Sequence, residues 1–136
     1  MTIKNIMTSD VLTLKPTDPF EKVQEVMRRV PFHHILIAEA DQKLLGLISD
    51  RDLMSQVAKF VNNNNGESFT DFLPRLTAAD IMTTDVITID KDTPIDAASI
   101  LLLEKNFSCL PVVDHKQEIE GIITWKDLLK YYTYHS

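Results

Sequence analysis

The chain has 136 residues, of which 44% are hydrophobic and 25% are charged, and this balance is typical of a folded domain with a packed core. Twenty acidic residues against fourteen basic ones give a formal net charge of −6, which disfavours binding to a nucleic-acid backbone. Cys109 is the only cysteine, so the chain can form neither an internal disulfide nor a cysteine-rich zinc site.

The sequence contains two copies of one pattern. Residues 6–13 read IMTSDVLT and residues 81–88 read IMTTDVIT, an offset of 75 residues. The same offset holds without gaps as far as the Asp-Leu pairs at 52–53 and 127–128. A repeat of this length predicts two equivalent structural units. Each would be close to the lower size limit for folding alone, so we expect them to share one buried interface.

Each copy opens with a short run rich in β-formers, at 11–14 and again at 86–89, and we predict a strand at both places. The stretches 17–19 and 92–94 then place residues suited to an N-cap before a proline. Because proline is favoured at the first helical position, a helix is predicted to begin at each.

The two predicted helices differ in their apolar patterns. The first has a single stripe at helical spacing, which indicates packing on a sheet, and the stripe consists of Phe20, Val23, Val26, Met27 and Val30. The second, Ile95 to Leu103, is apolar nearly all round and therefore needs burial on more than one face. A contact between two copies of the chain would supply that burial, so we expect a homodimer.

Two further strands in each copy form a predicted hairpin, 35–38 with 45–49 and 110–113 with 121–124, and a closing helix follows. The boundary between the copies is polar and rich in asparagine. We predict a first repeat at 1–60, a flexible connection at 61–77 and a second repeat at 78–136.

The β-α-β-β-α order, the opening Ile-Met-Thr-x-Asp-Val-x-Thr and the strand ending Gly-x-Ile-[Ser/Thr]-x-x-Asp-Leu together resemble the CBS domain, named after cystathionine β-synthase. The resemblance covers both copies. It implies an α/β (α+β) fold of two tandem repeats packed as a pseudo-twofold pair, within one integrated module. It also implies a regulatory rather than catalytic role, with two clefts for adenosine-containing ligands and no required cofactor.

The resemblance also implies which residues line these clefts, each cleft being shared between the repeats. One cleft would combine the start of the first closing helix with the opening of the second repeat: Ser49, Arg51, Asp52, Thr84, Asp85, Val86, Phe107 and Ser108. The other would combine the reverse set: Thr124, Lys126, Asp127, Ser9, Asp10, Val11, Phe32, His33 and His34. The aspartates would accept hydrogen bonds from ribose hydroxyls, and Arg51 and Lys126 would lie near phosphate.

Simpler interpretations exist for several of these residues. Ser49-x-x-Asp52 and Thr124-x-x-Asp127 have the spacing of a helix capping box, so the aspartates could serve only as caps. Adjacent strand residues point to opposite faces, so His33 and His34 are not expected to hold a metal. Cys109 has no activating neighbour in the sequence and is expected to pack as a small hydrophobic residue.

The leading functional hypothesis is a nucleotide sensor that binds AMP, ADP, ATP or S-adenosylmethionine and regulates an unidentified protein partner. The alternative is a constitutive dimerisation scaffold whose clefts are vestigial. No phosphate loop, nucleophile elbow or histidine-carboxylate metal motif is present in the sequence, so we do not expect an enzyme. With no leader-like start and no segment of membrane-spanning length, we expect a cytoplasmic protein without nucleic-acid or membrane partners.

Overall fold

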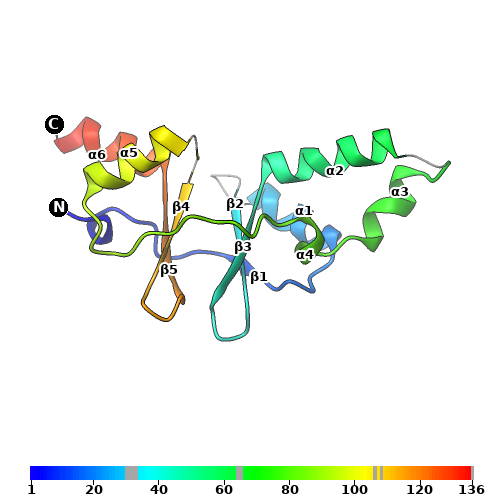
Figure 1. The fold of residues 1–136 in the computed structure, drawn as a ribbon, viewed down its shortest axis with the longest axis horizontal. Helices are drawn as coiled ribbons and strands as arrows, with labels where there is room; N and C mark the ends of the chain where they lie inside the picture. Colours follow the sequence, from blue (N-terminus) through cyan, green and yellow to red (C-terminus); the bar gives the residue numbers. More distant parts are fainter. Residues whose placement is uncertain (30–33, 64–65, 106, 108, 136) are drawn as a thin grey trace. The chain divides into compact units, whose positions relative to one another are not determined.

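The computed structural model describes residues 1–29, 34–63, 66–105, 107 and 109–135 (Figure 1). It divides into two compact units that do not follow the order of the sequence. Unit 1 consists of Met1–Val11, Gln42–Leu44 and Ile87–Ser136, and unit 2 of Leu12–Asp41 and Leu45–Val86. Each unit therefore combines the body of one repeat with the opening segment of the other. The opening segment of the first repeat is residues 1–11, in unit 1, and that of the second is residues 77–86, in unit 2.

Unit 2 is built on a three-stranded sheet with the order β1-β2-β3, in which β1 runs parallel to β2 and Thr13 lies opposite Leu36. Its elements are β1 (Thr13–Leu14), α1 (Phe20–Arg29), β2 (His34–Ala38), β3 (Leu44–Ser49, whose first residue is grouped with unit 1), α2 (Asp50–Asn62), α3 (Phe69–Phe72), the 3-10 helix η2 (Leu73–Arg75) and α4 (Ala78–Ile81).

Unit 1 contains an antiparallel hairpin in which Cys109 lies opposite Thr124. Its elements are the 3-10 helix η1 (Ile3–Asn5), α5 (Ile95–Lys105), β4 (Cys109–Val113), β5 (Ile119–Thr124) and α6 (Trp125–His135). The predicted hairpins, and the closing helices after Ser49 and Thr124, are therefore confirmed.

Each unit has its own apolar core. In unit 2 the predicted stripe of α1 is buried, and Val23, Val26 and Met27 pack with Ile35 and Ile37 of β2; Val30 lies outside the described residues. In unit 1 the core joins one residue of the first repeat to seven of the second: Ile3, Ile95, Ala98, Leu102, Leu110, Val112, Ile123 and Leu128. The apolar helix α5 buries only part of its surface, since Ile100 remains 55% exposed and Leu103 70%.

The prediction of a full strand at 86–89 is wrong. Among the described residues, the β pairing of this stretch consists of one parallel bridge between Ile89 and Val112. The Val86 N–H donates instead to the Thr84 carbonyl at 3.0 Å, so part of the backbone is used in a local turn. The matching run in the first repeat is also shorter than expected, since β1 begins only at Thr13.

The opening segments are held in the same way in both units. The N–H of Thr2 donates to the Asn5 side chain at 3.0 Å, and the N–H of Thr77 donates to the Asp80 side chain at 2.8 Å, 75 residues later. The helix behind each cap then bonds to the other repeat: Ile3 N–H to Thr93 O at 2.9 Å, and Ala78 N–H to Asp18 O at 2.8 Å. The two repeats thus exchange their opening segments.

Part of the stretch interpreted as a flexible connection is helical. Helices α3 and η2 lie there, and the Phe60, Phe69 and Phe72 rings form an aromatic cluster with centroids 4.9 to 6.3 Å apart. The Arg75 guanidinium lies 5.8 Å from the Phe72 ring centroid, within cation–π range. The sequence 69–75 therefore builds a small apolar cluster of its own against the end of α2.

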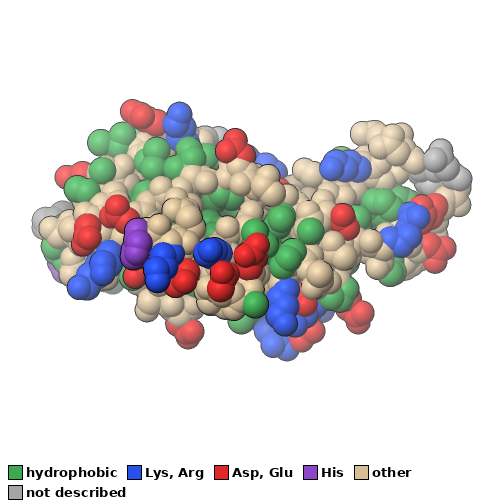
Figure 2. All heavy atoms as spheres, turned by 60° about the horizontal axis from the view of Figure 1, so that its bottom comes forward, with side chains coloured by type: hydrophobic (Ala, Val, Ile, Leu, Met, Phe, Trp, Pro, Cys, Tyr) green, Lys and Arg blue, Asp and Glu red, His purple; other side chains and the backbone are tan. Residues whose placement is uncertain are grey.

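The surface carries both signs of charge. On the face drawn in Figure 2, acidic and basic side chains lie interspersed rather than gathered into an area of one sign. Within the described part of the chain, no helix has the length and apolar character needed to cross a bilayer.

Candidate functional site

The first candidate site lies at the start of α2, where Ser49 is the N-cap residue. Its backbone is extended, with φ −116° and ψ 172°, and its Oγ accepts from the Asp52 N–H at 3.3 Å. Asp52 Oδ2 in turn accepts from the Ser49 N–H at 2.7 Å and from the Ser49 hydroxyl at 3.0 Å. The predicted capping box is therefore present, and the half-buried Asp52 carboxylate is held in one orientation.

A threonine from the second repeat completes the bonds of this carboxylate. The Thr83 hydroxyl donates to Asp52 Oδ1 at 2.8 Å. The backbone of Thr83 is held by two hydrogen bonds to Leu47 of β3. The Leu47 N–H donates to the Thr83 carbonyl at 3.0 Å, and the Thr83 N–H donates to the Leu47 carbonyl at 2.8 Å. Asp52 thereby ties the start of α2 to the opening segment of the other repeat.

The same arrangement occurs in unit 1 around Asp127. Its Oδ2 accepts from the Thr124 N–H at 3.0 Å and from the Thr124 hydroxyl at 3.2 Å. The Thr8 hydroxyl donates to Asp127 Oδ1 at 3.4 Å, and Thr8 pairs with the Ile122 backbone at 3.0 and 2.9 Å. The bond from Thr8 is the longer and weaker of the two threonine bonds.

Two glycines make this docking possible. A Cβ at Gly46 would lie 2.7 Å from Met82 Sδ and 2.8 Å from the Thr83 carbonyl oxygen. A Cβ at Gly121 would lie 2.8 Å from the carbonyl oxygen of Thr8. Real side chains do not approach so closely, so the repeated glycine is needed for the Met-Thr segment to reach the strand.

Most of the residues that the resemblance assigned to one cleft fall within the same compact unit. Unit 2 holds Ser49, Arg51, Asp52, Thr84, Asp85 and Val86; unit 1 holds Thr124, Lys126, Asp127, Ser9, Asp10 and Val11. The two basic residues are exposed, whereas Val11 and Val86 are half-buried. The role of these residues in binding a ligand stays a prediction.

The residues before the hairpins are placed differently. Phe32, His33 and Ser108 lie outside the described residues. His34 begins β2 and is only 8% exposed. Phe107 packs against the core of unit 1, and its carbonyl accepts from the Trp125 indole N–H at 3.1 Å. His34 and Phe107 belong to the unit that lacks the aspartate with which the resemblance grouped them, so that grouping stays a prediction.

Sequence reasoning missed Thr8 and Thr83 as neighbours of the aspartates. It selected the residues that follow them, Ser9 to Val11 and Thr84 to Val86. The available signal was the identity of the two threonines at the 75-residue offset, next to the equally repeated glycines of the hairpins.

Comparison with known proteins agrees with the repeat. A sequence model of the CBS domain matches residues 3–59 and 78–134. The chain belongs to the CBS domain family.

Several relatives of this CBS pair are known. The uncharacterized protein MK0525 of Methanopyrus kandleri is 27% identical over 130 residues, which cover 96% of this chain and 62% of that protein. The homoserine O-acetyltransferase of Methanohalobium evestigatum is 28% identical over 93% of this chain, but the match spans only 23% of the enzyme. The chain therefore spans less than two thirds of the length of these relatives.

The fold of the CBS pair is also found among solved structures. The crystal structure of the CBS domain pair of protein MJ0100, in complex with 5′-methylthioadenosine and S-adenosyl-L-methionine, superimposes with a TM-score of 0.80. The two sequences are 25% identical, and the match covers 100% of this chain and 98% of that one.

Cys109 of the CBS pair is a packing residue, as expected. It is 4% exposed, and burial raises the pKa of its thiol to about 12. Because the thiolate is the reactive form of cysteine, this group is inert near neutral pH.

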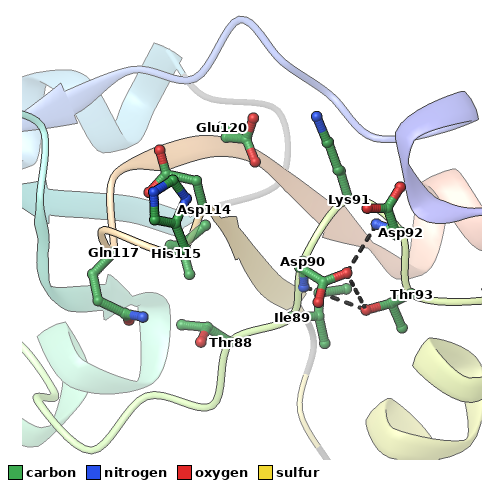
Figure 3. A pocket seen from close by; sticks show the side chains of 11 residues that line it. Thr88, Ile89, Asp90, Lys91, Asp92, Thr93, Asp114, His115, Gln117 and Glu120 are labelled. Carbon is green, nitrogen blue, oxygen red and sulfur yellow. Dashed lines mark hydrogen bonds between the residues drawn. The ribbon is translucent and has the colours of Figure 1, made fainter.

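A separate hollow of about 790 Å³ lies in unit 1, between residues 88–93 and the turn that joins β4 to β5 (Figure 3). Asp90 Oδ1 accepts from the Asp92 N–H and the Thr93 hydroxyl at 2.9 and 3.3 Å. Asp114 Oδ1 accepts from the Lys116 and Glu118 N–H groups at 2.8 and 3.0 Å. These two carboxylates hold turns, and none of the predicted site residues lines this hollow.

Proposed function

We propose that this CBS pair is a regulatory module that binds an adenosine-containing ligand, namely AMP, ADP, ATP or S-adenosylmethionine. The observation that carries the proposal is the pair of half-buried aspartates, each held by a serine or threonine at the start of a helix and by a threonine of the other repeat. The ligand-bound CBS pair of MJ0100 supports the choice of adenosine compounds.

The chemistry of each site suits a nucleotide. A fixed carboxylate can accept charge-assisted hydrogen bonds from ribose hydroxyls. Arg51 and Lys126, each one residue before its aspartate and exposed, would meet a phosphate or another anionic group. The half-buried Val86 and Val11 would contact the adenine.

We assign no catalysis to the module. Asp52 and Asp127 have matching partners, and each is bound by an N–H and a hydroxyl at Oδ2 and by a threonine hydroxyl at Oδ1. A general acid and a general base need environments that separate their pKa values, and two matching environments do not provide this.

Calorimetric titration with AMP, ADP, ATP and S-adenosylmethionine tests the proposal, together with thermal unfolding in the presence of each compound. A ligand that binds only the folded state raises the melting temperature by mass action. We expect at least one compound to bind and to raise it. If millimolar concentrations of all four leave both measurements unchanged, the sensor proposal is wrong.

Replacing the aspartates separates binding from capping. In Asp52→Asn or Asp127→Asn, the asparagine keeps one oxygen for the cap, so the free energy of unfolding should fall by no more than about 1 kcal/mol. A ribose loses charge-assisted bonds worth about 1.5–3 kcal/mol, so affinity at the altered site should fall about tenfold or more. Titration and denaturant unfolding of each variant measure the two effects.

A constitutive dimerisation scaffold is the second candidate function, and one observation favours it. Both aspartates accept three hydrogen bonds from groups of the protein itself, as helix caps do. If both asparagine variants destabilise the protein and leave nucleotide affinity unchanged, the aspartates are caps alone and the scaffold is the better description.

We further propose that two copies of the chain associate through α5. Ile100 and Leu103 lie one turn apart on the same side of this helix, and they remain 55% and 70% exposed. Sedimentation at tens of micromolar should detect a dimer, and Leu103→Lys should shift it toward monomer because a charge would enter an apolar contact. A monomeric wild-type protein, with and without nucleotide, contradicts the proposal.

A further inference from the structure

The two proposed sites match in the hydrogen bonds of their aspartates but differ in the charges beside them. Three pairs of charged residues recur at the 75-residue offset: Asp52 with Asp127, Arg51 with Lys126, and Asp10 with Asp85. The first residue of the helix breaks this correspondence. It is Asp50 in α2 and Trp125 in α6, and both are exposed.

Trp125 brings an uncharged ring to the start of α6. Its indole N–H, the only polar group of the side chain, donates to the Phe107 carbonyl at 3.1 Å, so the orientation of the ring is fixed. Trp125 therefore leaves the positive charge of Lys126 uncompensated. Asp50, in contrast, places a carboxylate next to Arg51 in the sequence.

A second difference lies one turn further along each helix. Lys130 follows Lys126 by four residues, so the two lysines project from the same side of α6. At the matching position of α2 stands Ser55, whose hydroxyl donates to the Arg51 carbonyl at 3.0 Å. Among the residues that the structure describes, neither lysine forms an ion pair.

The beginnings of the two helices therefore differ in net charge. Two lysines against one aspartate give residues 125–130 a formal charge of +1, whereas two aspartates against one arginine give residues 50–55 a charge of −1. The positive end of a helix dipole favours an anion, and the first turn of α2 already holds two carboxylates where that of α6 holds one. The start of α6 is thus the better place for an anionic ligand.

We propose that the two sites select their ligands by the charge of the group attached to the adenosine. The site at the start of α6 takes adenosine compounds that carry phosphate. The site at the start of α2 takes adenosine compounds without phosphate, such as S-adenosylmethionine or 5′-methylthioadenosine. Asp50 and Lys130 are the specificity-determining residues. This inference rests on the proposed function and gives each of its sites a separate ligand class.

The expected size of the effect follows from simple electrostatics. Charges about 6 Å apart interact appreciably even in water, and this distance is shorter than the Debye length of about 8 Å at physiological salt. A phosphate monoester carries close to two negative charges at neutral pH, so it responds to each neighbouring charge more strongly than a singly charged group does. An uncharged adenosine compound should not respond.

Titration with AMP and 5′-methylthioadenosine tests the proposal at one site at a time. Asp127→Asn weakens the site of α6, so that titration follows the site of α2, and Asp52→Asn does the reverse. We expect the ratio of AMP affinity to 5′-methylthioadenosine affinity to be about fivefold or more higher in Asp52→Asn than in Asp127→Asn.

Exchanging the charges should move this ratio. In the Asp127→Asn background, Asp50→Asn should strengthen AMP binding about threefold and leave 5′-methylthioadenosine binding within about twofold of the parent. In the Asp52→Asn background, Lys130→Ser should weaken AMP binding about two- to threefold. Both effects should shrink as salt is added, and thermal unfolding of each variant checks its fold.

Asp71→Asn is the matched control, because it removes the same charge from an exposed residue of unit 2. Asp71 lies in α3 between Phe69 and Phe72, which pack on Phe60. Phe60 follows Asp50 by ten residues of helix, or about 15 Å, which is well beyond the Debye length. The control should therefore leave AMP affinity unchanged.

The other outcomes are distinct. If Asp50→Asn changes the affinity for both probes by the same factor, or if Asp71→Asn has an equal effect on AMP, the charge at the site does not select the ligand. The inference is then overturned while the proposed function stands. Equal probe ratios at the two sites, or an Asp127→Asn chain that binds neither probe, overturn it in the same way. If the unsubstituted chain binds no adenosine compound, the inference and the proposed function both fail.

Discussion

Asp52 and Asp127 each combine two roles in a single residue, capping a helix and, in the proposed function, binding a ligand. Capping interactions of this kind are worth about 1 kcal/mol, so the carboxylates contribute to folding whether or not a ligand is bound. The same bonds fix the orientation of the carboxylates in advance, which lowers the entropic cost of binding. A cap and a ligand site on one residue are therefore compatible, and the capping box is no argument against binding.

Gly46 and Gly121 should tolerate no side chain. In Gly46→Ala the new Cβ would overlap the Thr83 carbonyl oxygen, so the docked segment must shift, and we expect a loss of about 1–3 kcal/mol in the free energy of unfolding. The same change at Gly121 meets the Thr8 carbonyl. Denaturant unfolding measures both variants.

A second substitution identifies the group responsible. Met82→Ala removes the sulfur near Gly46 but leaves the Thr83 carbonyl in place. Gly46→Ala should therefore lower the free energy of unfolding by the same amount in a Met82→Ala background as in the parent. Full rescue there means that the side chain of Met82, rather than the backbone, sets the need for glycine.

Some contacts of these residues were predictable and others were not. Ser49 and Asp52 lie three residues apart, so local spacing alone indicated their capping box. The bond from Thr83 to Asp52 joins residues 31 positions apart, and the bond from Thr8 to Asp127 joins residues 119 apart. No local pattern contains that information, which is why the threonines were missed.

The same distinction holds for whole elements. The hairpins and closing helices were predictable because their periodicity and caps are local. The strand expected at 86–89 depends on a parallel partner elsewhere in the chain, and one bridge to Val112 is all that forms with the described residues there. Helices α3 and η2 have no long apolar period, and the packing of Phe69 and Phe72 on Phe60 supports α3 instead.

The turn between β4 and β5 should make stability depend on pH through Asp114. The N–H of Glu118, followed by that of Lys116, holds the pKa of this carboxyl below its usual value. A lowered pKa in the folded state stabilises the protein above the unfolded-state pKa, about 4, and this stabilisation is lost as the pH falls through the folded-state value.

Asp114→Asn should therefore have a lower melting temperature than the parent at pH 7, and the gap should narrow below about pH 4. Thermal unfolding of both proteins across this range gives the comparison. If the difference between the two melting temperatures stays constant down to the lowest pH at which both proteins fold, the ionised carboxylate has no such role.

In the molecule as a whole, a repeat of the sequence and a compact unit of the structure do not contain the same residues. Periodicity reveals two copies, but it does not say which copy each opening segment packs against. Ile3 is fully buried among side chains of the second repeat, and Ile81 is 4% exposed in the core of the first. The grouping of each opening segment with the other repeat was implied by the resemblance to the CBS domain, and the buried contacts that hold it are given by the structure.

Substitutions in the opening segments should act on the opposite repeat. Ile3→Ala should lower the free energy of unfolding by about 2–5 kcal/mol, because it leaves a cavity in the core of unit 1. It should also speed amide hydrogen exchange in α5 and β4 more than in α1 and β2. Ile81→Ala should give the reverse pattern, so each variant serves as the control for the other. Exchange that rises mainly within the substituted repeat contradicts the exchanged arrangement.

The exchanged opening segments also bear on how such a chain can arise by duplication. One repeat on its own has an opening segment and a body, but in this structure those two parts make their contacts with another repeat. A lone repeat could satisfy the same contacts only through reciprocal domain swapping with a second molecule, at a strength set by protein concentration. Joining the repeats in one polypeptide replaces that concentration with an effective one in the millimolar range, and turns a bimolecular assembly into intramolecular folding.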